Sequence, residues 1–459
     1  MKYIIAAILV LLSVSFYAQD NSDSVMMRNI YTYHLTKSNS YENLRYLCKK
    51  IGGRISGSTQ AEKAVAWAAK AMKDAGADTV YLIPCMVPRW VRGPKEQGVV
   101  SVGKSKQQLN LCALGGSVGT GKTGITAQVV EVNSFDELDK LDADKVKGKI
   151  VFFNVAFDAS LISTGSAYGK TVKYRWAGPS KAAKMGAAAT VVRSMTLADN
   201  DIPHTGSMTY DTLVKEKIPA FALGPKSAGI LSKLLSQDKN LQLFLYSGCE
   251  TLPDVPSFSV VGEIRGKELP NEVIVAGGHL DSWDTGEGAH DDGAGVVQSI
   301  EILATLKATG IKNKRTFRAI AFMNEENGLR GGNSYAQFAL NEKGKKHIAA
   351  IESDGGGLVP RSLGVVGGAD TVTYYKKWEK LFTPYQVQIV AGGGGADIGP
   401  LEKQGVTQMS LNVDGQRYFD YHHTADDVFE NVHKRELELG SAAMTSLVYL
   451  LDKYGAYKK

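Results

Sequence analysis

Short apolar runs alternate with amphipathic stretches along the second half of this 459-residue chain. Strand-like runs at 272–276, 315–323 and 347–353 are each followed by a polar or glycine-rich loop and then by a helical pattern. Alternation of this kind predicts an α/β fold with a mainly parallel, or mixed, sheet sandwiched between helices. Ligands bind outside the carboxyl ends of the strands in such sheets, so the residues after each strand are the first candidates for function.

The other elements follow from the same periodicities. A capping box of Thr59 and Glu62 predicts the start of one helix near the N-terminal end. We expect further strands at 79–84, 385–390 and 407–413, and helices at 41–50, 61–75, 295–306, 333–340, 372–381 and 435–454.

Side chains that bind metal ions follow three of these strands. His279 lies just past the first strand, Glu325 and Glu326 past the second, and Asp354 past the third. Because parallel strands end at the same edge of a sheet, we expect these side chains to lie close together. Imidazole nitrogens and carboxylate oxygens, without thiolates, suit a catalytic zinc site.

Two further motifs, HDDGAG and YHHTADD, add Asp291 and His423 to this set. One bridging carboxylate with two ligands per metal would satisfy a pair of zinc ions about 3.5–4 Å apart. Two choices stay open, because Asp292 adjoins Asp291 and His422 adjoins His423. The alternatives without metal are a solvated acidic turn and a packed aromatic corner.

Three common catalytic motifs do not explain this chain. Residues 116–123, GSVGTGKT, fit the P-loop pattern, and the overlapping GGSVG at 115–119 fits a nucleophile elbow. Both motifs require a following helix, whereas the next residues, GITAQVVEV, are strand-like. No HExxH occurs, so a helix-based protease with one zinc is not supported.

Residues 1–18 read as a signal peptide, with Lys2 before an apolar run and Ala18 at the cleavage point. The run is too short to span a bilayer. We therefore expect an exported protein, periplasmic or secreted, with no membrane span after processing. The net charge of +6 comes with no basic stripe, so nucleic acid is not an expected partner.

Export would make the four cysteines possible disulfide partners, with three possible connectivities. Four buried free thiols are the alternative. The cysteines have no CxxC spacing and are poor metal ligands; they are Cys48, Cys85, Cys112 and Cys249.

The sequence pattern changes between residues 110 and 250. Short strand-like runs alternate there with turns rich in glycine and serine, and one alanine-rich helix is expected. We interpret this region as a separate, inserted lobe. Its expected strands are 127–132, 149–155, 189–194 and 218–224.

Five motifs in order, GGHLDSW, HDDGAG, NEEN, SDGGG and HHTADD, resemble a known family of metallopeptidases. It is the two-zinc family that includes bacterial leucyl aminopeptidases and glutamate carboxypeptidases. The resemblance covers essentially the whole mature chain and implies a peptidase domain in two parts, 19–109 and 251–459. It also implies that the lobe at 110–250 is a β-rich domain of the protease-associated type.

The resemblance implies a role for each candidate residue. Asp291, the first of its pair in this family, would bridge two zinc ions, and His423 is preferred because Asp427 follows it at the family's spacing. Glu325 would be the general base, and Asp281 would orient His279. The remaining implied ligands are His279 and Asp354 on one zinc and Glu326 and His423 on the other.

The function implied by the resemblance is that of a di-zinc exopeptidase acting on short peptides, most simply dipeptides with free termini. The alternatives are a zinc aminopeptidase acting on longer peptides and a non-catalytic relative without metals. A homodimer is possible. Candidate substrate contacts are Trp283, the loop 392–397, Arg330 and Arg175.

Overall fold

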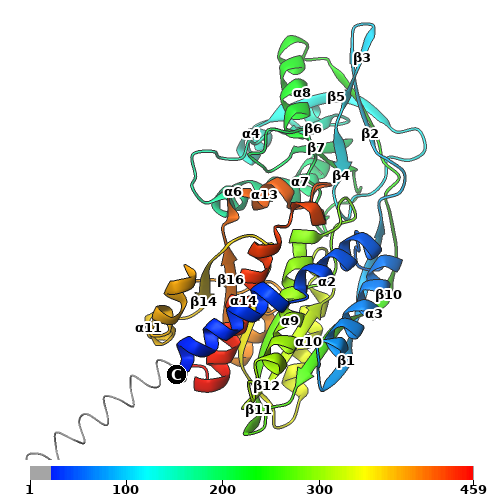
Figure 1. Ribbon diagram of the computed structural model, residues 1–459. Helices are drawn as coiled ribbons and strands as arrows, with labels where there is room; N and C mark the ends of the chain where they lie inside the picture. The colour runs from blue at the N-terminus through cyan, green and yellow to red at the C-terminus, as the bar shows by residue number, and fades with distance from the viewer. Residues whose placement is uncertain (1–21, 458–459) are drawn as a thin grey trace, which may run out of the picture.

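The structure is a computed structural model that describes residues 22–457. The signal peptide predicted at 1–18 lies outside these residues. Two eight-stranded sheets build two lobes, one above the other in Figure 1. Within the described residues, no helix is long and apolar enough to cross a membrane.

The first sheet is built from eight strands: β1 (Thr79–Val91), β10 (Glu250–Ile264), β11 (Leu269–His279), β12 (Arg315–Phe322), β13 (Lys346–Glu352), β14 (Pro360–Val365), β15 (Gln388–Ala391) and β16 (Thr407–Val413). Their spatial order is β1-β10-β12-β11-β13-β16-β14-β15. The central pairs β12–β11, β11–β13 and β13–β16 are parallel, whereas β1–β10, β10–β12 and β14–β16 are antiparallel. The predicted mixed sheet is thus confirmed.

Helices cover both faces of this sheet because successive side chains of a buried strand point to opposite sides. Ile274 and Ala276 of β11 pack in one core with α3 (Thr59–Asp74), α9 (Ala294–Ala308) and α14 (Lys434–Tyr454). Val273 and Val275 pack in another core, against α10 (Arg330–Asn341). This arrangement confirms the predicted α/β class.

The second sheet has the order β3-β2-β9-β5-β6-β7-β8-β4. The long antiparallel pair β1–β10 carries the chain into this lobe and back. Two strands of this lobe, β2 and β3, lie before residue 110, where the lobe was expected to begin. The assignment of the lobe as a protease-associated-type domain stays a prediction. The strands are β2 (Gln97–Val102), β3 (Ser105–Leu109), β4 (Leu111–Ala113), β5 (Ile125–Val132), β6 (Ile150–Phe153), β7 (Ala189–Arg193), β8 (Ala220–Leu223) and β9 (Gln242–Tyr246).

The lobes meet where α6 (Thr164–Trp176) faces the segment around α13 (Tyr418–Tyr421), as Figure 1 shows. The Thr164 hydroxyl donates to the carbonyl of Gly415 at 2.7 Å. The rings of Tyr168 and Phe419 stack with centroids 4.7 Å apart. Residues 116–123 lead into β5 rather than into a helix, as expected from the sequence.

Several boundaries differ from those predicted. Helix α3 is capped by Ser58, whose hydroxyl accepts from the Ala61 amide, so the cap lies one residue before Thr59. The helix expected at 41–50 is α2 (Ser40–Tyr46) followed by a π-helical turn, and the helix expected at 372–381 is divided into α11 (Ala369–Lys376) and α12 (Glu379–Phe382). The four cysteines are buried free thiols, so the disulfide alternative is not realised.

Candidate metal centre

The candidate ligands come from five separate segments that meet at the carboxyl edge of the first sheet. His279 is the last residue of β11, Glu326 follows β12 and Asp354 follows β13. Asp291 lies in the turn Ala289–Gly293, just before α9, and its own backbone is not helical. His423 lies in the loop after α13. The predicted convergence of these residues is therefore present in the structure.

Asp291 stands at the centre of the group. Its Oδ1 lies 3.0 Å from Nε2 of His279, and its Oδ2 lies 3.3 Å from Nε2 of His423. Nε2 of His279 is also 3.4 Å from Oδ1 of Asp354, and Nε2 of His423 is 3.2 Å from Oε2 of Glu326. One carboxylate thus joins two groups of nitrogen and oxygen donors.

The donor atoms form two groups that share Asp291. His279, Asp291 and Asp354 offer atoms that all lie within 4.8 Å of one another, and so do Asp291, His422 and His423. Within the described chain, Oδ2 of Asp291, Oε1 of Glu326 and Oδ1 of Asp354 are buried without a hydrogen-bond donor. Because a buried carboxylate oxygen without a donor is costly, these atoms are suited to a metal ion.

The pKa shifts indicate that the site attracts positive charge. Burial lowers the pKa of His423, but Glu326 and Asp291 outweigh burial and raise that pKa to about 10. The pKa of His279 is also well above its usual value, because Asp291 and Asp354 outweigh burial. Burial and the charge of Asp291 raise the pKa of Glu326 to about 7. Cationic partners therefore stabilise the clustered carboxylates.

The choice between neighbouring residues follows from the contacts. The carboxylate of Asp292 accepts instead from two backbone amides, those of His279 at 3.0 Å and Gly295 at 2.9 Å. His422 stacks on His423, and its Nε2 lies 3.7 Å from Oδ2 of Asp291. Only His423 of this pair also forms an ion pair with Glu326 in the described structure. The geometry therefore favours Asp291 and His423.

Asp281 holds the loop that carries the two glutamates. Its Oδ1 accepts from the amides of Asn324 at 2.6 Å and Glu325 at 3.1 Å, and its Oδ2 accepts from the amide of Glu326 at 3.3 Å. The contact with His279 is made instead by the main-chain carbonyl of Asp281, 2.9 Å from Nδ1. The carboxylate therefore positions Glu325 and Glu326 rather than His279.

Asp427 holds the loop that carries Asp291, in the way that Asp281 holds the loop of the glutamates. This supporting role of Asp427 was not predicted from the sequence. Its Oδ1 accepts from the amides of Ala289 at 3.1 Å and His290 at 2.6 Å, and its Oδ2 accepts from the amide of Asp291 at 3.1 Å. Burial and the charge of Asp291 raise the pKa of Asp427 to about 7. The only signal in the sequence was the spacing of Asp427 from His423.

Comparison with known proteins agrees with this geometry. Residues 259–448 match a family model described as Peptidase family M28. Carboxypeptidase Q of Bos taurus is 33% identical over 424 residues, which cover 92% of this chain and 87% of the relative. The chain belongs to peptidase family M28. This result confirms the resemblance that the five motifs indicate.

Two solved structures share the architecture. The crystal structure of a peptidase M28 precursor from Shewanella amazonensis SB2B has a TM-score of 0.89 at 30% identity, covering 96% of this chain and 98% of that one. BSAP, a zinc aminopeptidase from Bacillus subtilis, has a TM-score of 0.63 at 20% identity, covering 90% and 94%. The second likeness shows that the fold is shared.

A cleft of about 560 Å³ opens over the candidate ligands of this M28 peptidase. Glu325 lines the cleft beside the ligands, and burial together with the charges of Asp354 and Glu326 raises its pKa well above the usual value. Tyr168 and Arg175 of the second lobe also line this cleft. Both lobes therefore enclose the space in which a substrate would bind.

The loop 392–397 lines a neighbouring cavity of about 400 Å³ through Gly393, Gly394 and Gly395. Below the loop, Oε2 of Glu352 accepts from the amide of Ile398 at 2.9 Å. A Cβ on Gly395 would lie 2.1 Å from the carboxyl carbon of Glu352, so glycine permits this close approach.

The remaining candidates for substrate contact have different positions. Trp283 is 3% exposed and packs against Trp90 and His423. It lines a small pocket together with Asp291, Glu326 and His423, and it is not among the residues that line the cleft. Arg330 lies outside the cleft and donates to Asp254 at 2.5 Å. Arg175 alone of these three side chains lines the cleft.

Proposed function

We propose that this chain is an exported di-zinc exopeptidase of family M28 that hydrolyses short peptides, chiefly dipeptides with free termini. Family membership makes it a metallopeptidase. The observation that carries the finer proposal is the Asp291 carboxylate, whose two oxygens face two separate groups of donors. A bridging carboxylate of this kind is typical of sites with two metals.

These contacts support one assignment of the ligands. His279 and Asp354 would hold one zinc, Glu326 and His423 would hold the other, and Asp291 would be shared. Zinc, when bound, polarises a carbonyl group and lowers the pKa of water toward ~7. Asp281 and Asp427 hold the loops that present these ligands, and such supporting contacts strengthen metal binding.

Glu325 would act as the general base. Its side chain reaches the cleft beside the ligands, and its backbone is fixed by Asp281. In this position the carboxylate takes a proton from the attacking water and passes it to the amine that leaves.

The second candidate is an aminopeptidase that acts on longer peptides. It is favoured by a relative named Aminopeptidase YwaD, from Bacillus subtilis, which is 24% identical over 89% of this chain. The non-catalytic alternative lacks a comparable observation, because every predicted ligand position is occupied by a donor that faces the others.

A hydrolysis panel tests the proposal. The purified protein should contain two zinc ions per chain and hydrolyse free dipeptides, and a chelator should abolish this activity until zinc is restored. N-blocked dipeptides and peptides of four or more residues serve as comparisons. Faster release of N-terminal residues from the longer peptides would favour the aminopeptidase. Protein with no bound zinc and no chelator-sensitive hydrolysis would contradict both peptidase proposals.

A further inference from the structure

A segment of the second lobe, residues 204–206, contacts the candidate ligand His423. Thr205, in the middle of this segment, is fully buried. Its amide donates to the main-chain carbonyl of His423 at 2.9 Å, and its own carbonyl oxygen lies 3.3 Å from Nδ1 of the His423 ring. One residue of the second lobe thus contacts both the backbone and the ring of a ligand that lies 218 positions further along the chain.

The segment lies close against the ring and the backbone of His423. Gly206 has a φ of 131°, and a Cβ at this position would lie only 2.5 Å from Nδ1 of His423, so glycine is required. His423 itself has a φ of 63°, in the left-handed region that residues other than glycine adopt only at a cost. The hydrogen bond from the Thr205 amide stabilises this conformation of the ligand.

The Thr205 carbonyl is placed to fix the orientation of the His423 ring. Nε2 of this ring faces Asp291 and Glu326, so the ring proton lies on Nδ1 when Nε2 serves as a metal ligand. A second neighbour of Nδ1, an Nη of Arg175 at 3.3 Å, is itself a donor and cannot accept that proton. The carbonyl of Thr205 is therefore the acceptor that holds the ring in place.

The other candidate histidine ligand has the same kind of support from a different source. Nδ1 of His279 lies 2.9 Å from the main-chain carbonyl of Asp281, only two positions along the same loop. His279 is thus oriented by its own lobe, whereas His423 is oriented by the second lobe. The two halves of the candidate metal centre therefore depend on different parts of the fold.

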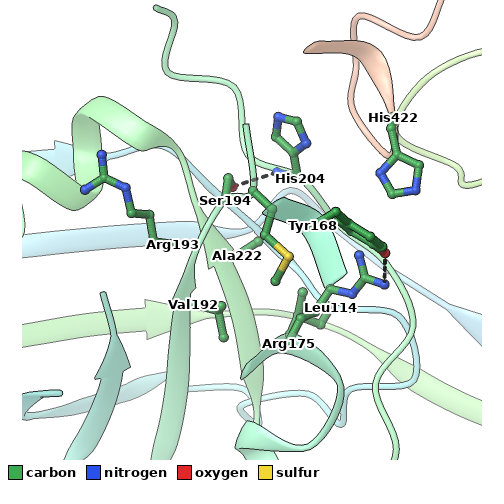
Figure 2. Close-up of a pocket in the computed structure, with 10 residues that line it drawn as sticks. Leu114, Tyr168, Arg175, Val192, Arg193, Ser194, His204, Ala222 and His422 are labelled. Atoms are coloured by element: carbon green, nitrogen blue, oxygen red, sulfur yellow. Dashed lines mark hydrogen bonds between the residues drawn. The ribbon is translucent and has the colours of Figure 1, made fainter. Parts of the chain in front are cut away.

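The segment is anchored within the second lobe on both sides of the Thr205 main chain. The amide of His204 donates to the hydroxyl of Ser194, just after β7, at 2.9 Å, as the dashed line in Figure 2 marks. The hydroxyl of Thr205 donates to the carbonyl of Ala113 in β4 at 2.9 Å. The position of the Thr205 carbonyl is therefore set by the second sheet.

A buried ion pair connects this segment with the first lobe. Arg92 follows β1, where the chain passes into the second lobe, and its side chain is 13% exposed. One Nη lies 2.6 Å from Oδ1 of Asp284, in the loop after β11, and also donates to the Thr205 hydroxyl at 3.3 Å. The other Nη donates to the carbonyl of Ala113 at 2.7 Å. Arg92 thus fixes Thr205 relative to the loop of the first lobe.

We propose that Thr205 is a positioning residue for the metal ligand His423, so that the second lobe sets the affinity of one of the two zinc ions. The zinc held by His423 and Glu326 depends on Thr205. The zinc held by His279 and Asp354 does not. The inference rests on the proposed di-zinc function and makes the second lobe part of the metal centre. Loss of such a supporting contact lowers metal affinity about 10- to 100-fold.

Calorimetric titration of zinc into the metal-free protein tests this role without turnover. Thr205→Val removes the hydroxyl that holds the carbonyl in place. We expect the affinity for one zinc to fall about 10- to 100-fold and the other affinity to change by less than about twofold. Thr205→Ser keeps the hydroxyl and should retain both affinities. Thr164→Val is the matched control, because it loses a threonine hydroxyl that joins the lobes through Gly415, and it should bind both zinc ions as the wild type does.

A second background identifies the zinc that is affected. His423→Ala lacks the ligand that Thr205 supports and should bind the zinc of the His279 group alone. Adding Thr205→Val to His423→Ala should leave the remaining affinity unchanged, because the two residues act on the same zinc. A fall of that affinity in the double variant would show a general structural effect and would overturn the proposal.

The possible failures can be told apart. Wild-type protein that binds fewer than two zinc ions contradicts the proposed function and this inference with it. A wild type with two zinc ions whose affinities survive Thr205→Val, or fall equally in Thr164→Val, overturns the role of Thr205 alone. If circular dichroism shows that Thr205→Val does not fold, Asp284→Asn decides. This change weakens the ion pair with Arg92 and should lower the same zinc affinity, and an unchanged affinity overturns the proposal.

Discussion

At the scale of single residues, the site depends on which oxygen or nitrogen faces which neighbour. Asp291 and Asp292 are adjacent, yet one faces two histidines and the other binds backbone amides. Asp281 supports Glu325 and Glu326 through its carboxylate, and His279 through its main-chain carbonyl. The direction in which each carboxylate points thus decides whether it is a candidate metal ligand or holds a neighbouring loop in place.

Glu325→Gln tests the general base at this scale. The amide keeps the size of the side chain but cannot take a proton, so we expect kcat to fall about 10²- to 10⁴-fold. Zinc content should stay at the wild-type level, because Glu325 is not among the proposed ligands. Metal analysis and dipeptide hydrolysis of the same preparation measure both. Wild-type turnover by the purified variant would remove Glu325 from the mechanism.

At the scale of elements, strand ends deliver the ligands and helices hold them in place. Helix α9 begins shortly after Asp291 and packs against the sheet and against α14. The contact between helices is not purely apolar, because Glu301 of α9 and Glu438 of α14 are both buried. Burial, with the charge of Glu438, raises the pKa of Glu301 to about 7.

This shift predicts a pH-dependent stability. The pKa of Glu301 is higher in the folded protein than the ordinary value near 4.5, so folding is favoured while the carboxyl is protonated. That contribution is complete below pH ~4.5 and is lost as pH rises through about 7, at a cost of about 3 kcal/mol. Glu301→Gln should therefore be more stable than wild type at pH 8 and similar at pH 4.5.

Urea unfolding at the two pH values measures the difference. Glu402→Gln, at an exposed position, is the matched control and should show no pH-dependent gain. If Glu301→Gln changed the free energy of unfolding equally at both pH values, the Glu301 carboxyl would not be the source of the pH dependence.

At the scale of the whole molecule, the centre joins distant parts of the chain. The contact between Arg175 and His423 spans 248 positions and connects the two lobes. Metal ions bound by five segments of the first lobe should therefore stabilise the folded state as a whole. Export and a homodimer, which also belong to this scale, stay predictions.

Removal of zinc should lower the melting temperature. At a zinc concentration of about 1,000 Kd the stabilisation is about 4 kcal/mol, which corresponds to a shift of roughly 10 °C for a domain of this size. Differential scanning calorimetry with and without chelator measures the shift. Asp291→Ala, which lacks the proposed shared ligand, should melt at nearly the same temperature in both conditions. An equal response of this variant and the wild type would contradict a shared role for Asp291.

Much of the fold was predictable because it follows from local patterns. Periodicity alone located β11, β12, β13 and β16, and the residues at the ends of the first three strands do converge. Boundaries were less predictable, because Ser58 rather than Thr59 caps α3 and β1 continues to Val91 through pairing with β10. Pairing with a partner strand cannot be read from the strand itself.

The sequence by itself determined the α/β class, the family and the set of candidate ligands, because backbone periodicity and motif order are local properties of the chain. Tertiary structure decided that Asp281 supports the glutamates, that Asp427 holds the loop of Asp291, and that Arg175 approaches His423. These contacts join residues far apart in the sequence. Which groups meet in these contacts depends on how the two lobes and several loops pack together. No local sequence pattern encodes that packing.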